Sequence, residues 1–181
     1  MTPDKPKPKI TLIMVMSANG VVAQKRIEDS FVWNSEADRV QFLQRVSDIG
    51  TAIMGANTYQ SIGGKPYDGV DFYVLTNHPD QFEPHDRVQF VKGNASEVCR
   101  ILKDKGLEHI ALLGGPTTNR HFLERELVDD IYLTIEPALL PGALQMVNGL
   151  DTQIRLELIN LTPLNEQKTL LLHYRVLHAQ S

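Results

Sequence analysis

Residues 51–59, TAIMGANTY, and residues 109–118, HIALLGGPTT, decide the fold that this sequence predicts. Each stretch begins with a short apolar run, typical of a buried strand, and passes through glycine into a segment that suits a helix. Pro116 fits a first helical position, because proline has no amide hydrogen to leave unpaired there. A strand, a glycine turn and a helix in this order form an anion site when the free N–H groups of the helix point outward. Neither turn is specific alone, because glycine is common in turns and the sequence has no G-x-G-x-x-G or Walker motif.

Other segments predict the rest of a mixed sheet. Short apolar runs at residues 10–16, 71–76, 88–91 and 128–135 indicate further strands, and residues 154–161 with 168–178 indicate a closing antiparallel hairpin. Asn94 with Glu97 three residues later has the spacing of a capping box. Strands alternating with helices predict an α/β fold with helices on both faces of the sheet. Residues 1–9, with their prolines and lysines, are predicted to be a flexible tail, and residues 10–181 a single domain.

Composition narrows the function classes. The chain has 181 residues with 42% hydrophobic and 22% charged side chains, as in an ordinary globular protein. A net charge of -4 argues against nucleic-acid binding, and no apolar run approaches the length of a membrane span. The single cysteine, Cys99, favours a reducing cytoplasm, and the six histidines lack the spacing of metal ligands, so no metal is expected. The sequence therefore predicts a cytoplasmic protein whose partner is a small molecule.

Asp38 is the strongest candidate for chemistry. It follows Trp33, the only tryptophan, and lies near the start of a helix that we expect to begin after Ser35 and run to Ile49. The apolar residues Phe42, Leu43, Val46 and Ile49 predict the buried face of this helix, with Asp38 at its margin. A carboxyl group at a core edge has a raised pKa and can deliver a proton near neutral pH. The alternative is that Asp38 only complements the positive end of the helix dipole.

The order of the motifs resembles the dihydrofolate reductase superfamily, which includes the reductase domain of riboflavin biosynthesis, over residues 10–178. The resemblance depends on the following segments: MSANGVVA at 16–23, Trp33-Asn34 with Ala37-Asp38 and Phe42, IMGANTYQSIG at 53–63, Leu75-Thr76, Gly114-Gly115 with Phe122-Leu123, and YLTI at 132–135. It implies a dihydrofolate reductase-like, mostly parallel eight-stranded sheet. It also implies an enzyme that transfers hydride from NADPH to a heterocyclic substrate.

The same resemblance implies roles for individual residues. Asp38 matches the family's active-site carboxylate and Thr134 the threonine that hydrogen-bonds to it, with Trp33 and Phe42 at the substrate. The implied cofactor site consists of Ala18 at the nicotinamide, Gly55, Asn57 and Thr58 in a phosphate-binding turn, Leu75 and Thr76 at the adenosine, and Leu113, Gly114, Gly115 and Thr117 in the second turn.

Departures from the family pattern concern charged groups. Ala56 and the pair Pro116-Thr117 stand where folate-reducing members carry arginines, and Val70 replaces the arginine that clamps a folate carboxylate. Lys92 either compensates at the 2′-phosphate of NADPH or is an ordinary surface lysine. Arg39 lies toward the predicted inward face of its helix, which suggests either a pocket cation for an anionic substrate or a side chain that reaches the rim.

Four functions remain open. The first is an NADPH-dependent reductase of a pteridine, pyrimidine or related heterocycle other than dihydrofolate. The others are reduction of a ribosylaminopyrimidine phosphate in the riboflavin pathway, true dihydrofolate reduction, and nucleotide binding without catalysis. The apolar run Leu170-Leu171-Leu172 indicates either a homodimer interface or a central strand.

Overall fold

The computed structural model describes residues 6–24 and 30–178. The strands are β1 (Lys9–Ser17), β2 (Thr51–Gly55), β3 (Asp71–Leu75), β4 (Val88–Val91), β5 (His109–Leu112), β6 (Asp130–Glu136), β7 (Arg155–Pro163) and β8 (Leu170–Leu177). The α-helices are α1 (Glu36–Ile49), α2 (Ala56–Ser61), α3 (Ala95–Asp104) and α4 (Pro116–Leu123). Short 3-10 helices span Ser30–Val32 and Pro79–Gln81. Of the predicted tail, residues 1–5 lie outside the described residues, and Lys9 already belongs to β1.

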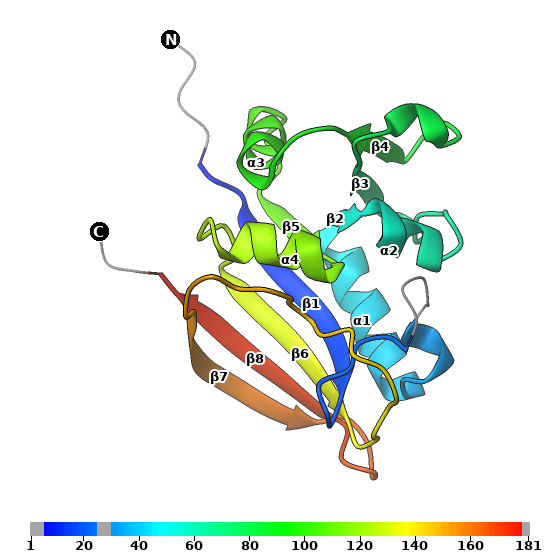
Figure 1. Cartoon of the computed structure of the whole chain (residues 1–181), viewed down its shortest axis with the longest axis vertical. Helices are drawn as coiled ribbons and strands as arrows, with labels where there is room; N and C mark the ends of the chain where they lie inside the picture. Colours follow the sequence, from blue (N-terminus) through cyan, green and yellow to red (C-terminus); the bar gives the residue numbers. More distant parts are fainter. Residues whose placement is uncertain (1–5, 25–29, 179–181) are drawn as a thin grey trace.

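The eight strands form one sheet in the order β4-β3-β2-β5-β1-β6-β8-β7 (Figure 1). Strands β1 to β6 pair with one another in parallel, whereas β8 is antiparallel to both β6 and β7. The predicted mixed sheet and its C-terminal hairpin are thereby confirmed. The run Leu170-Leu171-Leu172 lies in β8, between β6 and β7, so its apolar character suits a central strand.

Helices cover both faces of the sheet, and successive residues of the central strands therefore enter different cores. Leu12 and Ile53 belong to one cluster with residues of α3 and α4, such as Val98 and Phe122. Ile13, the strand neighbour of Leu12, belongs to a second cluster that contains residues of α1 and α2. No helix among residues 6–24 and 30–178 is both long enough and apolar enough to cross a bilayer.

The two longest helices, α1 and α3, begin with the predicted capping residues. The Ser35 hydroxyl accepts a hydrogen bond from the Asp38 amide at the start of α1, and Asn94 forms the capping box with Glu97 at the start of α3. Helix α1 ends at Ile49 and is capped by Gly50, whose φ of 74° is readily adopted by glycine.

The buried face of α1 is centred on different residues from those predicted. Asp38 and Val46 are buried, and Phe42 and Ile49 are partly buried, but Leu43 is exposed. Residues at steps of four lie above one another on a helix, so the line through 38, 42 and 46 faces the core and Leu43 is turned roughly 100° away. Asp38 therefore occupies the buried stripe itself rather than its margin.

Candidate functional site

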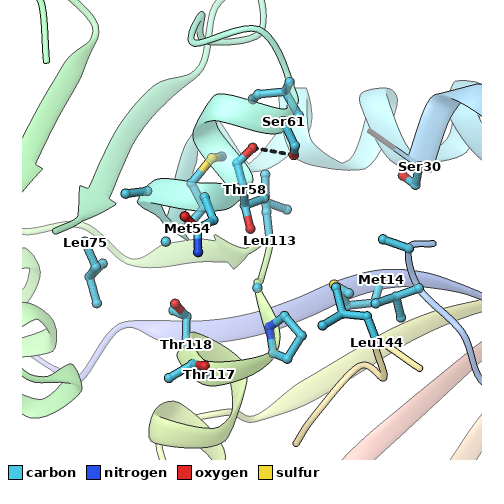
Figure 2. Close-up of a pocket in the computed structure, with 18 of the residues that line it drawn as sticks. Met14, Ser30, Met54, Thr58, Ser61, Leu75, Leu113, Thr117, Thr118 and Leu144 are labelled. Carbon is cyan, nitrogen blue, oxygen red and sulfur yellow. Dashed lines mark hydrogen bonds between the residues drawn. The ribbon is translucent and has the colours of Figure 1, made fainter. Parts of the chain in front are cut away.

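A cavity of about 740 Å³ opens at the carboxyl ends of the central strands. It is lined by the ends of β2, β3 and β5 with the residues that follow them, by Asp38 and Phe42 of α1, and by the start of α4. In Figure 2, Thr117, Thr118 and Leu75 lie toward one side of the cavity and Ser30, Met14 and Leu144 toward the other. Ligands of open α/β sheets bind at this edge, because the loops and helix starts converge there.

The two glycine turns lie side by side. The amide of Gly55 donates to the carbonyl oxygen of Gly114 over 2.8 Å, which joins the end of β2 to the turn after β5. A Cβ at Gly55 would come within 2.8 Å of the Thr118 hydroxyl, and one at Gly115 within 3.2 Å of the Thr58 hydroxyl. Glycine is therefore needed at Gly55 for the two turns to approach this closely.

Asp38 lies at the wall of this cavity and is only 2% exposed. Its Oδ2 accepts a hydrogen bond from Asn34 Nδ2 at 2.6 Å, and its Oδ1 accepts one from Gln41 Nε2 at 2.9 Å. The Thr134 hydroxyl also hydrogen-bonds to the Asp38 carboxylate, and Gln41 Nε2 lies 3.2 Å from that hydroxyl oxygen. Both carboxylate oxygens are thus fixed in direction by neighbouring side chains.

The pKa of Asp38 is raised above the ordinary aspartate value. Burial is the largest cause, because it disfavours the charged form. The hydrogen bonds from Thr134, Gln41 and Asn34 lower the pKa, and the negative charge of Glu136 raises it again. The net effect keeps a proton on this side chain to a higher pH than an exposed aspartate would allow.

Glu136, at the end of β6, connects this site to the start of α1. One of its carboxylate oxygens accepts hydrogen bonds from the Ser35 amide at 2.8 Å and the Ser35 hydroxyl at 2.7 Å. The other accepts a hydrogen bond from the Thr169 hydroxyl at 2.8 Å. Ser35 caps the helix that carries Asp38, so Glu136 anchors the first turn of α1 against the sheet.

The cavity brings together most of the residues predicted for a site. Its walls include the following predicted residues: Asp38, Phe42, Gly55, Asn57, Thr58, Leu75, Thr76, Leu113, Gly115 and Thr117. Thr134 is buried behind Asp38, and Gly114 contributes its carbonyl to the contact between the turns.

Four further predicted residues lie neither in the cavity wall nor in the contacts just described. Ala18 is exposed, and its amide donates to the carbonyl of Ala138. Trp33 precedes the cap of α1, and Lys92 is exposed after β4. Arg39 is not part of the cavity wall, and its Nη1 donates to the carbonyl of Phe31 over 2.9 Å. The inward direction predicted for Arg39 followed from the misplaced centre of the α1 stripe.

Gln41, Glu136 and Thr118 were absent from the predicted site, and Asn34 was named only as part of a motif. Gln41 contacts Asp38 because residues three apart are neighbours on a helix, and this spacing was a usable signal. Glu136 lies two residues after Thr134 on the same face of β6, a relation that the period of a strand also predicts. Its contact with Ser35 depends on the packing of α1 against the sheet and has no local signal.

The described residues contain no group of three or more His, Cys, Asp or Glu side chains that could hold a metal ion.

Comparisons with known proteins identify the family and the fold of this chain. A model of the RibD C-terminal domain matches residues 68–170. Uncharacterized protein YwjB of Bacillus subtilis (strain 168) is 25% identical over 158 residues, which are 83% of this chain and 88% of YwjB.

Solved structures share the fold at low identity. A dihydrofolate reductase from Enterococcus faecalis complexed with NADP(H) has a TM-score of 0.77 at 18% identity, over 94% of this chain and 97% of that one. A pyrimidine reductase-like protein from Corynebacterium diphtheriae has a TM-score of 0.78 at 16% identity, over 95% of this chain and 93% of that one. These similarities confirm the predicted architecture of the sheet.

Proposed function

This chain belongs to the RibD C-terminal domain family and has a dihydrofolate reductase-like fold, and we propose that it is an NADPH-dependent reductase. Its substrate is a pteridine, a pyrimidine or a related heterocycle. The observation that carries the proposal is the arrangement of one cavity, in which two adjacent glycine turns and a buried carboxyl group of raised pKa share the same walls.

The residues of one end of the cavity suit a dinucleotide. The first turn offers the amide of Asn57 and the hydroxyl of Thr58, and the start of α4 offers the hydroxyls of Thr117 and Thr118. Free main-chain N–H groups at a helix start bind phosphate, and Gly55 and Gly115 allow a close approach. The E. faecalis structure with NADP(H) supports a nicotinamide cofactor here. Bound NADPH supplies the hydride, and the protein supplies position and protons.

Asp38 acts on the substrate. Asn34 and Gln41 hold the carboxyl group in one orientation, and burial raises its pKa, so Asp38 carries the proton that a reduced ring nitrogen or carbon requires. Thr134 and Gln41 form a hydrogen-bonded support behind it. These residues position the acid, and only Asp38 reaches the cavity wall.

Oxidation of NADPH with a panel of oxidised and dihydro heterocycles tests the proposal. The panel contains pterins, dihydrofolate and a ribosylaminopyrimidine phosphate. We expect substrate-dependent loss of the absorbance of reduced nicotinamide, and a decrease of at least about a hundredfold in Asp38→Asn, as is typical when general acid catalysis is removed. Binding of NADPH by calorimetry without turnover of any compound would instead indicate a nucleotide-binding module.

The riboflavin-pathway reductase is the second candidate, because the matching family model is that of the RibD C-terminal domain. Turnover confined to the ribosylaminopyrimidine phosphate would establish it. Turnover confined to dihydrofolate would establish a dihydrofolate reductase.

A further inference from the structure

The geometry points to a substrate that carries neither a phosphate nor a carboxylate: an uncharged or cationic heterocycle without an acidic tail. This inference rests on the proposed reductase function and names the class of substrate that the same cavity accepts. It excludes both dihydrofolate, which has a carboxylate tail, and a ribosylaminopyrimidine phosphate.

The two ends of the cavity have different chemistry. The end near the glycine turns offers main-chain N–H groups and the hydroxyls of Thr58, Thr117 and Thr118. The end near Asp38 is lined mainly by apolar and aromatic side chains, among them Val22, Phe31, Phe42, Ile62 and Tyr67, with hydroxyl groups at Ser30 and Tyr67. A dinucleotide therefore has partners for its phosphates, whereas a substrate beside Asp38 meets mainly hydrocarbon.

Among the described residues that line the cavity, Asp38 is the only acid and none is a lysine or an arginine. The one imidazole, His78, follows β3 with Thr76 and Asn77, at the end that we assign to the cofactor. A phosphate or carboxylate beside Asp38 would lose its hydration without gaining a positive partner, and it would also face a like charge whenever Asp38 is ionised.

Four basic side chains on neighbouring elements lie outside the lining of the cavity. Arg39 donates to the carbonyl of Phe31. Arg45, two turns after Asp38 on α1, stacks over the ring of Tyr132 with 3.7 Å from its guanidinium carbon to the ring centroid. Lys65 and Lys92 are exposed and lie outside the cavity wall. None of these four cations belongs to the wall of the cavity.

Three aromatic rings form the wall that would receive the substrate ring. Phe31 and Phe42 meet edge to face with centroids 5.7 Å apart, and Phe42 and Tyr67 do so at 5.8 Å. Phe31 and Tyr67 are stacked at 6.4 Å. Such rings favour a flat apolar or cationic partner over an anion, because the faces of aromatic rings are negative.

Matched ligand pairs test the inference by calorimetric titration of the whole chain saturated with NADP⁺. The pairs are 6-hydroxymethylpterin with pterin-6-carboxylate, and a ribosylaminopyrimidine with its 5′-phosphate. We expect the member without the acidic group to bind at least about tenfold more tightly, which corresponds to about 1.4 kcal/mol. Equal or tighter binding of the acidic member, or no binding of any member, overturns the inference.

A variant that adds a positive charge to the wall should change the preference between the two members of each pair. Ile62→Arg places a cation in the apolar wall, and we expect it to reduce or reverse the preference within each pair. Leu139→Arg adds the same charge at a residue that is 77% exposed and outside the wall, so the preference should stay unchanged.

Lys25 and Arg26 lie outside the described residues and are tested directly by the double variant Lys25→Ala with Arg26→Ala. Tight binding of an acidic ligand to the original chain that is lost in this variant also overturns the inference. Because the readout is binding, the inference and the reductase function fail separately: selective binding without hydride transfer contradicts only the latter.

Discussion

At the scale of single residues, Asp38 is a carboxyl group that is almost fully removed from water, with only 2% of its surface exposed. Its burial raises its pKa, and this effect exceeds the opposing effect of the three hydrogen bonds from Thr134, Gln41 and Asn34. A proton is therefore bound more tightly by the folded than by the unfolded chain. Linkage then requires that this residue make folding less favourable as pH rises.

This linkage predicts how Asp38→Asn changes stability with pH. The contribution of wild-type Asp38 is most favourable below the ordinary aspartate pKa and is lost as pH rises through the raised pKa of the folded state. As pH rises, the unfolding free energy of Asp38→Asn should therefore increase relative to that of the wild type. The total increase should be about 1.4 kcal/mol for each unit by which the pKa of Asp38 in the folded chain exceeds that in the unfolded chain.

Urea unfolding of both proteins between about pH 4 and about pH 8 measures this gain. Asp48→Asn removes an exposed carboxylate from the same helix and controls for the general effect of lost charge. A difference between wild type and Asp38→Asn that is independent of pH, or that falls as pH rises, would contradict a raised pKa.

Glu136→Gln isolates the charge of the second carboxyl group. The negative charge of Glu136 raises the pKa of Asp38, so its removal should lower that pKa and move the pH profile of kcat/KM to lower pH. Titration of the Asp38 side chain by carbon NMR reports the same shift without turnover. Thr169→Val removes one hydrogen bond to Glu136 but keeps its charge, and it should leave the profile near that of the wild type.

The sequence was sufficient to predict that Asp38 is shielded from solvent, that Thr134 hydrogen-bonds to it, and that Ser35 caps α1. The contact with Thr134 follows from a family resemblance, and the cap follows from a local rule. Gln41 and Glu136 were missed although both lie at regular helix or strand spacings from predicted residues. The error for Arg39 has a single cause, because counting Leu43 as buried moved the centre of the helical stripe.

At the scale of elements, α1 and α3 provide a matched comparison, because both begin with a side-chain cap but only α1 carries a residue of the site. Loss of the cap in Ser35→Ala should lower the unfolding free energy by about 1 kcal/mol. The total loss should be larger, because the Ser35 hydroxyl also donates a hydrogen bond to Glu136. Asn94→Ala should cost about 1 kcal/mol as well.

The two variants should differ in activity. The Ser35 hydroxyl joins the first turn of α1 to Glu136, so Ser35→Ala should lower kcat by moving Asp38 relative to the cavity. Asn94→Ala, at the start of a helix that contributes no residue to the cavity wall, should keep the kcat of the wild type. Equal losses of kcat in both variants would mean that Ser35 acts only through stability.

Strands and helices were predicted well where the signal is local. The capping box of α3 and the proline at the first position of α4 mark their helices directly. β6 was predicted to begin at residue 128 but begins at Asp130, because buried Val128 extends the apolar run beyond the paired residues. A hydrophobic pattern reports burial rather than hydrogen-bond pairing, so strand ends remain the least certain feature.

At the scale of the whole molecule, the order of the strands creates the site. β5 lies between β2 and β1 although it is distant from both in sequence, and this position brings the turn after β5 against the turn after β2. The strand pattern predicts a mixed sheet, but it does not specify which strands become neighbours. The family resemblance implied only that both turns belong to one cofactor site, and the structure supplies the strand order.

The same organisation predicts a global effect of cofactor binding. The cavity is lined both by Met14 and Leu75, which pack against the first core cluster, and by Met54 and Leu113 of the second. NADPH that binds only the folded chain should therefore stabilise both layers together. The gain in unfolding free energy should be about 2.7 kcal/mol when the free ligand is at a hundred times its Kd.

Urea unfolding with increasing NADPH, followed by fluorescence and by circular dichroism, measures this gain. Asn94→Ala should show the full increment, because α3 lies away from the cavity wall. Gly55→Ala should show a smaller increment, because the added Cβ would come within 2.8 Å of the Thr118 hydroxyl and disturb the contact between the turns. If Gly55→Ala shows the full increment, the dinucleotide binds away from the paired glycine turns. The same conclusion follows if NADPH shifts only one of the two optical transitions.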